Sequence, residues 1–419
     1  MTGGGNLKLQ KLFLENFRGI KELVIDLSGE NAVFYGINGV GKSSILRGVS
    51  LLFSNIITRI SESQIRQQLA FTASDLRIGA SELKVFGQFQ FDNMEDIRYG
   101  CAYKKKTGKK FIKKDVDTFI DRVSELYAGK DVGTPIFAHY GVNRTVLDIP
   151  LRIKVRHDFG KIAAYQNTLG KTDFRTFFEW FRNQEDIENQ EKVSRKDLEY
   201  KDPALEAVRT AIYAILPDIS DLKIKRSPLR MCGTKNGQVF SIEQLSDGEK
   251  CTLAMIGDIA RRLSIANPNL SDPLQGGGIV LIDEVDLHLH PSWQRKIASI
   301  LRTTFPNVQF ILTTHSPQVL GELREGFKIL SLMQENGELK FREITPGYYD
   351  SNLVLEDYMD TPKVNPVIDG LENQALEFIM EGEIEQAEEV ISQLNDLTNG
   401  TSPVITKAQM LIYRKKNKC

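Results

Sequence analysis

The sequence lacks the features that mark membrane, secreted and zinc-binding proteins. No apolar run among its 419 residues approaches the ~20 needed to cross a bilayer, and residues 1–6 do not form the basic-then-apolar pattern of a secretory signal. The four cysteines (Cys101, Cys232, Cys251 and Cys419) lie far apart without a C-x-x-C pair, which fits a reducing compartment and offers no zinc site. We therefore expect a cytoplasmic protein without a membrane partner.

An excess of charge of one sign is also missing. The 54 Lys and Arg against 55 Asp and Glu give a formal net charge of −1, so any nucleic-acid surface must be local. The densest basic stretch is the lysine run between Lys104 and Lys114. It could contact a DNA phosphate backbone without reading sequence, and a solvated hairpin is the alternative interpretation.

Apolar patterns predict the elements of an α/β fold. Strands are expected over 7–14, 23–27, 32–35, 82–91, 97–105, 222–225, 239–242, 279–282 and 308–312. Helical patterns cover 43–53, 113–128, parts of 160–216, and 248–266. The last two strand runs are short and wholly apolar, as in buried parallel strands, and a helix beginning at Pro291 separates them. From Asn365 onward, two amphipathic helices broken near Gly382 and a third after Pro403 are expected.

The strongest motif is the segment Gly36–Ser43, which matches G-x-x-x-x-G-K-[ST] at every fixed position. The expected strand before it and helix after it argue against a chance glycine turn. In such a loop, backbone N–H groups surround phosphate oxygens, Lys42 reaches the β- and γ-phosphates, and Ser43 can bind Mg²⁺. The motif predicts ATP and Mg²⁺ as ligands. The expected nucleotide-binding residues here are Gly36, Asn38, Gly39, Gly41, Lys42, Ser43 and Ser44.

Two carboxylates follow the apolar strand 279–282. Asp283 is expected to bind Mg²⁺ together with Ser43, and Glu284 to act as the base toward the attacking water. Taken alone, an apolar run followed by acids could be an ordinary strand end. The phosphate-binding loop elsewhere in the chain favours the catalytic interpretation.

Two further segments complete an ordered series. Leu245-Ser246-Asp247-Gly248-Glu249 opens a long helix, whose first N–H groups can bind an anionic oxygen. His315 follows two threonines at the end of an expected strand. His288 and His290 are expected to shape the turn into the Pro291 helix rather than to bind a metal, because no third ligand is evident.

In this order, the motifs resemble those of ABC-type ATPases of the SMC and RecF branch, where they are the P-loop, signature, Walker B and switch histidine. Asp247 replaces a glycine of the transporter signature. Asn16-Phe17-Arg18-Gly19 resembles the N-F-R-G of this branch, whose arginine approaches the nucleotide. Residues 283–294 and 313–317 resemble blocks of OLD-like and anti-phage ATPases, which adds Asp286 to the nucleotide site and makes His315 the γ-phosphate sensor.

This resemblance, which covers about a third of the chain, implies an ABC-type α/β head with a mixed sheet and a parallel sheet. It implies catalysis by Lys42, Glu284 and His315. It also implies a homodimer that sandwiches two nucleotides, with Ser246 and Gly248 of one chain against the γ-phosphate held by Lys42 of the other. The expected parts are a first head lobe (1–112), a mainly helical insertion (113–216), a second head segment (217–350) and a helical tail (351–419).

An OLD-like ATPase without a nuclease motif of its own resembles the PtuA family of ATPase subunits in Septu-type anti-phage systems, which also accompany some retrons. That resemblance implies a separate HNH nuclease subunit and a larger homo-oligomer. A RecF-like DNA-repair ATPase and a transporter nucleotide-binding subunit are the alternatives. The residue linking nucleotide to the insertion (the Q-loop) stays open among Gln88, Gln90, His139, Tyr140 and Arg144.

Overall fold

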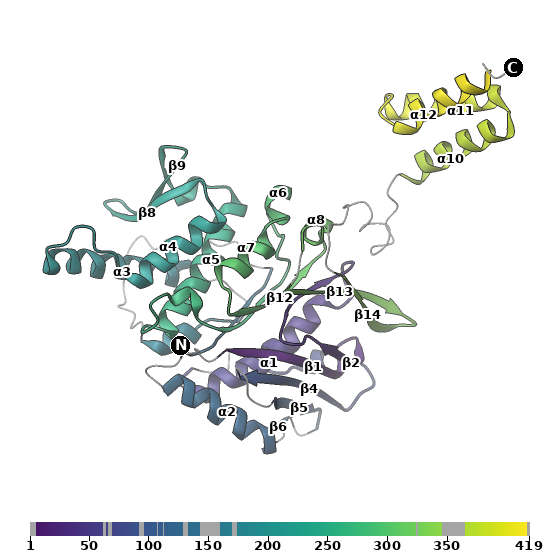
Figure 1. Ribbon diagram of the computed structural model, residues 1–419. Helices are drawn as coiled ribbons and strands as arrows, with labels where there is room; N and C mark the ends of the chain where they lie inside the picture. The colour runs from purple at the N-terminus through teal and green to yellow at the C-terminus, as the bar shows by residue number, and fades with distance from the viewer. Residues whose placement is uncertain are drawn as a thin grey trace. The chain divides into compact units, whose positions relative to one another are not determined.

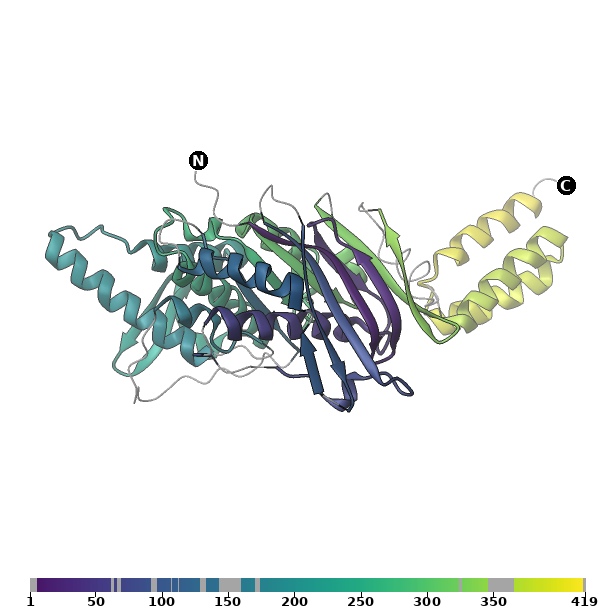
Figure 2. The same cartoon turned by 90° about the horizontal axis from the view of Figure 1, so that it is seen from below.

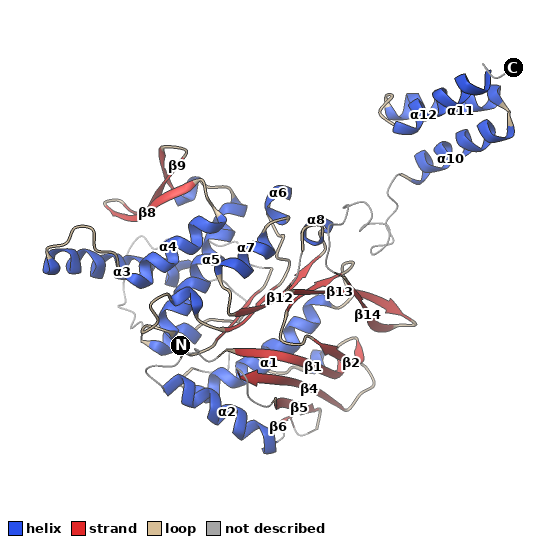
Figure 3. Ribbon diagram, viewed as in Figure 1, coloured by secondary structure: helices blue, strands red, loops and turns tan. Residues whose placement is uncertain are grey.

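The computed structural model describes residues 6–61, 64–65, 69–91, 96–106, 108–111, 113–128, 133–142, 160–169, 174–323, 326–345 and 365–416. The chain forms two compact units, Met1–Tyr349 and Asp350–Cys419. The first unit combines sheets and helices, and the second is helical (Figure 3). No helix among the described residues is long and apolar enough to span a membrane.

A six-stranded sheet runs through the first unit in the order β14-β13-β3-β12-β11-β7. Its strands are β3 (Asn31–Tyr35), β7 (Ile136–Tyr140), β11 (Gly278–Ile282), β12 (Val308–Thr314), β13 (Phe327–Glu335) and β14 (Glu338–Ile344). Every pairing is parallel except that between β13 and β14. β11 and β12 are buried along their whole length, as expected for parallel strands covered on both faces. The parallel arrangement brings the carboxyl ends of β3, β11 and β12 to one edge.

A second sheet is antiparallel, in the order β2-β1-β4-β5-β6. Its strands are β1 (Leu7–Phe17), β2 (Ile20–Asp26), β4 (Glu82–Phe91), β5 (Ile97–Lys104) and β6 (Gly108–Phe111). Helix α1 (Lys42–Ile60) contacts strands of both sheets, and α2 (Lys113–Ala128) packs on α1 and β5 (Figure 2). Most of α1 is buried, because the helix contacts strands of both sheets.

The remaining helices of the first unit lie across the six-stranded sheet from α1 (Figure 1). They are α3 (Phe174–Arg195), α4 (Pro203–Ile215), α5 (Asp247–Ala266), α6 (Pro291–Gln294), α7 (Ile297–Thr304) and α8 (Pro317–Leu320). A small antiparallel sheet consists of β8 (Ile219–Arg226), β9 (Leu229–Lys235) and β10 (Gln238–Ser241). Short 3₁₀ turns are η1 (Ala73–Asp75), η2 (Lys161–Tyr165), η3 (Ile242–Gln244) and η4 (Pro273–Gln275).

The segment 113–216, expected as a mainly helical insertion, also contains a strand among its described residues. It contains β7, an edge strand of the six-stranded sheet that pairs with β11 in parallel. β7 is only five residues long and its partner comes far later in the chain, so the local sequence carries little signal for it. The helical patterns of the same segment are confirmed in α2, α3 and α4.

A buried charge cluster attaches α5 to the end of β7. Asp258 accepts hydrogen bonds from the Tyr140 hydroxyl (2.9 Å), Arg261 Nη2 (2.6 Å) and Arg262 Nε (2.7 Å). Arg262 Nη1 also donates to the carbonyls of Ala164 (2.7 Å) and Gln166 (2.9 Å). Burial by itself would raise the pKa of Asp258, but the two guanidinium charges outweigh it and hold that pKa below the usual range.

Replacing Asp258 by asparagine is expected to lower the free energy of unfolding by about 3 kcal/mol, because two buried arginines would lose their counter-charge. Urea unfolding at pH 7 measures this. Asp221→Asn is the matched control: this aspartate is 59% exposed and pairs with Lys223, so its loss should cost less than about 1 kcal/mol. Equal, small losses for both variants would contradict a structural role for the buried cluster.

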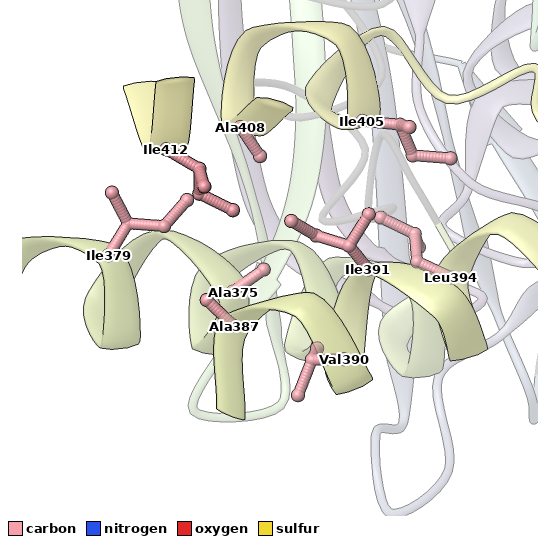
Figure 4. Close-up of a cluster of buried hydrophobic side chains, with 9 residues drawn as sticks. All are labelled: Ala375, Ile379, Ala387, Val390, Ile391, Leu394, Ile405, Ala408 and Ile412. Carbon is pink, nitrogen blue, oxygen red and sulfur yellow. The ribbon is translucent and has the colours of Figure 1, made fainter. Parts of the chain in front are cut away.

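The described residues of the second unit form three helices, α10 (Pro366–Glu381), α11 (Ile384–Thr398) and α12 (Pro403–Lys416). The Asn365 side chain caps α10 at its start, and Gly382, in the left-handed region at φ 92°, ends it. Apolar side chains of all three helices form a core of their own (Figure 4): Ala375, Ile379, Ala387, Val390, Ile391, Leu394, Ile405, Ala408 and Ile412. The predicted helices and the break at Gly382 are confirmed.

Candidate nucleotide-binding site

The loop between β3 and α1 has the backbone that its glycines predict. Gly36, Gly39 and Gly41 all have positive φ values, of 151°, 81° and 124°. A Cβ atom at Gly36 would lie 2.8 Å from the carbonyl oxygen of Leu332 on β13, so only glycine fits there. The loop therefore passes close to the sheet and then opens into α1, with Asn38 and Ser43 exposed and Ser44 half-buried.

The Lys42 side chain folds back over this loop. Its Nζ donates to the carbonyls of Gly36 (2.6 Å) and Ile37 (3.1 Å), and the residue is only 6% exposed. Burial lowers the pKa of Lys42, while the charges of Glu284, then Asp283 and Asp286, raise it. The lysine and the acids after β11 thus act on one another electrostatically across the same sheet edge.

Hydroxyl groups at the end of β12 hold the acids that follow β11. Thr313 Oγ1 donates to Asp283 Oδ1 (2.5 Å), and the Glu284 N–H donates to the same hydroxyl oxygen (2.8 Å). Thr314 Oγ1 donates to Asp286 Oδ1 (2.5 Å). Glu284 has a φ of 48°, a left-handed conformation that is costly for a residue with a side chain and is common at functional sites.

His315 lies beside this group. Its Nε2 is 3.8 Å from Asp286 Oδ2, and its side chain is 42% exposed. Its Nδ1 has no hydrogen-bond partner among the described residues. The turn around it is held by Gln294, the last residue of the 283–294 block, whose contacts were not predicted from the sequence. Gln294 accepts from Ser316 Oγ (2.8 Å) and donates to the carbonyl of Leu289 (3.0 Å). The imidazole therefore faces the site edge from a fixed backbone.

The predicted signature begins α5. Ser246 is exposed and caps the helix, accepting from the Glu249 N–H (3.3 Å), while Glu249 forms an ion pair with Lys235. A Cβ at Gly248 would lie 2.2 Å from the carbonyl oxygen of His288, so the helix start packs directly on the turn after Asp286. A cavity of about 620 Å³ opens between these two segments.

His288 and His290 belong to the turn, as predicted. His290 Nδ1 accepts from the Ser292 N–H (3.3 Å) at the start of α6. Within the described ranges, no group of three or more His, Cys, Asp or Glu side chains is arranged to hold a metal ion.

Arg18 follows β1 and meets a residue that sequence reasoning missed. Its Nε donates to Asp75 Oδ1 (3.1 Å), and Arg47 of α1 donates to both carboxylate oxygens (2.6 and 2.7 Å). Asp75 is fully buried; burial would raise its pKa, but hydrogen bonds from Arg47, Thr72 and Arg18 lower the pKa to about 2. The only local signal for this residue is the capping box that Asp75 forms with Thr72 around η1.

The Q-loop candidates fall in different places. Gln88 and Gln90 lie on β4, where they hydrogen-bond to Asp96 and Gln10. The His139 ring contacts Ser50 of α1 (2.8 Å), whereas the Tyr140 carbonyl accepts the Asp283 N–H (2.8 Å) at the site edge. Arg144 lies outside the described residues, and the Q-loop assignment stays a prediction.

The lysine run is described in part. Lys104 ends β5 and pairs with Glu82 (3.4 Å), and Lys105 and Lys106 are exposed in the following turn. The side chains of its other members, from Lys109 to Lys114, lie outside the described residues.

Comparisons with known proteins agree with the motifs. Residues 32–321 match the family described as "AAA domain, putative AbiEii toxin, Type IV TA system". The chain is 32% identical over 392 residues to the Retron Ec83 probable ATPase of Escherichia coli, covering 75% of this chain and 70% of that protein. It is 30% identical over 398 residues to the Retron Vc95 probable ATPase of Vibrio cholerae serotype O1 biovar El Tor, covering 79% of this chain and 77% of that one.

A more distant relative is the Septu protein PtuA of Bacillus thuringiensis, 25% identical over 374 residues and covering 84% of each chain. Among solved structures, the SMC head bound to the C-winged helix domain of ScpA is similar with a TM-score of 0.51 and 16% identity. That match covers 81% of this chain and 98% of the other. This likeness shows the fold alone, and it confirms the predicted ABC-type head.

Proposed function

The chain belongs to the AAA-domain family matched over residues 32–321 and is an ATPase; from this premise we propose that it is the nucleotide-driven subunit of a cytoplasmic anti-phage defence complex. In this proposal it binds ATP with Mg²⁺, dimerises through the nucleotide and controls a separate HNH nuclease. The observation that carries the catalytic part is the carboxylate and hydroxyl arrangement at the ends of β11 and β12 beside Lys42.

The residues present fit a magnesium ion bound together with nucleotide. Mg²⁺ prefers oxygen ligands and is usually held by one or two carboxylates, water and the substrate's phosphates rather than by an all-protein cage. Ser43, at the start of α1, is exposed, and Asp283 supplies a carboxylate held by Thr313. The bound ion would neutralise charge on the phosphate oxygens.

The remaining groups support in-line attack of water on the γ-phosphate. Lys42 exchanges its loop carbonyls for phosphate oxygens, with the loop amides as further donors. Glu284 accepts the proton of the attacking water. Its backbone, at a φ of 48°, is held in place by the hydrogen bond from its N–H to Thr313 Oγ1. His315, whose Nε2 lies 3.8 Å from Asp286 Oδ2, donates to a γ-phosphate oxygen.

Glu284→Gln is expected to bind ATP as wild type does but to hydrolyse it at least about a hundredfold more slowly, because the amide keeps the shape and loses the basicity. Lys42→Ala should instead bind ATP at least about tenfold more weakly, since the phosphate charge loses its buried cation. Fluorescent-nucleotide titration and phosphate release separate the two. Wild-type turnover in Glu284→Gln would remove Glu284 from catalysis.

The signature supports a nucleotide sandwich between two chains. Ser246 is exposed at the start of a long helix, where N–H groups and the helix dipole favour an anionic oxygen. The contact between Gly248 and His288 ties this helix start to the turn after Asp286, so both can respond to a nucleotide presented by a second chain.

Ser246→Arg in a Glu284→Gln background is expected to bind ATP and stay monomeric, whereas Glu284→Gln alone should dimerise on ATP addition. The long side chain would block the approach of a second chain's γ-phosphate. Light scattering with and without ATP measures this. Ser299→Arg, an exposed serine on α7, controls for the added charge. An ATP-dependent dimer that persists in the Ser246 variant would rule out the sandwich.

The helical tail is the proposed docking element for the nuclease and for larger assembly. It folds around its own core and still exposes large apolar side chains, among them Met380 (74%) and Tyr413 (71%). Acidic residues line its first two helices: Glu372, Glu377, Glu381, Glu385, Glu388 and Glu389. A self-contained unit with exposed apolar groups can bind a partner without disturbing the nucleotide site.

Removing residues 365–419 should leave ATP hydrolysis within about twofold of wild type, because the tail core includes no residue of the first unit. The same truncation should abolish binding of a purified HNH nuclease subunit, because it removes the proposed docking element. Phosphate release and pull-down from a two-component mixture are the measurements. Nuclease binding that survives truncation would place the contact in the first unit. Tight DNA binding by the chain alone, lost when Lys104–Lys106 are neutralised, would favour the RecF-like alternative.

A further inference from the structure

The buried carboxylate of Asp75 accepts hydrogen bonds from three residues, Arg18, Arg47 and Thr72. Its Oδ1 accepts from Arg18 Nε (3.1 Å) and Arg47 Nε (2.6 Å). Its Oδ2 accepts from Arg47 Nη2 (2.7 Å), and from the Thr72 N–H and hydroxyl (3.0 Å each). Its own carbonyl accepts the Arg18 N–H (2.7 Å). The carboxylate is fully inaccessible to solvent, so this arrangement is a fixed part of the fold.

The guanidinium of Arg18 is anchored on one side only. Nε is bound to Asp75, and the two terminal nitrogens make no hydrogen bond to any described residue. The side chain is 35% exposed, compared with 19% for Arg47, whose fork is bound bidentately. An arginine bound through Nε and open at both Nη atoms can still form a bidentate contact with an anion.

Two contacts place this arginine beside the P-loop. Arg47 is four residues after Ser43 and three after Ser44, so all three share one face of α1, and Asp75 joins Arg18 to that face. On the other flank, Lys21 pairs with Glu338 (2.9 Å), the residue before Leu339, and Leu339 packs on Gly41. These contacts place Arg18 next to the face of α1 that carries Ser43 and Ser44, the residues proposed to hold phosphate.

We infer that Asp75 is a positioning residue of the nucleotide site: it holds Arg18 so that both terminal nitrogens face the polyphosphate of bound ATP. This inference rests on the proposed function. Asp75 itself does not touch the nucleotide. It separates two arginine charges that would otherwise repel each other, and it removes the side-chain freedom that Arg18 would have to lose on binding ATP.

The test is a double-mutant cycle on ATP affinity. Asp75→Asn and Arg18→Ala are each expected to raise the Kd for ATP by about tenfold, the usual effect of losing one charge-assisted contact. Because Asp75 acts through Arg18, the double variant should bind no more weakly than Arg18→Ala alone. A general structural role would instead weaken binding by a further similar factor in the Arg18→Ala background, and that additive result would overturn the inference.

A second variant keeps the test valid if Asp75→Asn unfolds. Arg18→Lys leaves Asp75 intact and retains one positive charge. A guanidinium can bind the Asp75 carboxylate through Nε and an anion through its two Nη atoms, whereas the lysine ammonium has only one nitrogen for both partners. The Arg18→Lys variant should bind ATP about as weakly as Arg18→Ala, and wild-type affinity would contradict the inference. Asp117→Asn is the matched control. It removes the ion pair between Asp117 of α2 and Arg59 at the far end of α1, and it should leave the Kd for ATP unchanged. If Lys42→Ala also leaves the Kd unchanged, the proposed function fails rather than this inference alone.

Discussion

The parallel register of β3, β12 and β11 is the constraint on which the rest of the structure depends. Tyr35 pairs with Thr314, and Ile282 pairs with Leu312, so the three strands end within a residue or two of one another. Parallel strands present their carboxyl ends at one edge, and each of these three is followed directly by a functional segment. Beyond the last backbone pair of β11 and β12, Thr313 and Thr314 hydrogen-bond to Asp283 and Asp286. These acids act electrostatically on Lys42.

Contacts outside the sheet connect this edge to the signature helix. The start of α5 is fixed by the close approach of Gly248 to the carbonyl of His288, and its middle by the Asp258 cluster around Tyr140. One end of that helix therefore meets the turn after Asp286, and its body meets the strand whose end adjoins Asp283. Packed and charged contacts therefore connect α5 to the edge of the sheet.

The two units differ in the kind of contacts that hold their interiors together. Every residue assigned to ATP chemistry lies in the first unit, where buried charges such as Asp75 and Asp258 are each satisfied by paired arginines. The second unit carries an aliphatic core and no such cluster among its described residues. This unit is held together by burial of its aliphatic core, with polar contacts such as the Lys416–Glu388 ion pair on its surface.

The local sequence by itself determined the phosphate-loop pattern and the tail helices, because each depends on short-range spacing: glycines with positive φ, or apolar residues at helical period. The acids after β11 were predicted from the end of an apolar strand, whereas the signature and the switch histidine were predicted from the family resemblance of the motif order, and the roles of all of them stay predictions. The local sequence also predicted the strands that carry a continuous apolar run. Only the tertiary structure revealed β7, the hydrogen-bond partners of Gln294 and Asp75, and the Asp258 cluster. These residues are defined by partners far along the chain, since a carboxylate in a short turn is recognisable as a ligand of two arginines only after folding brings them together.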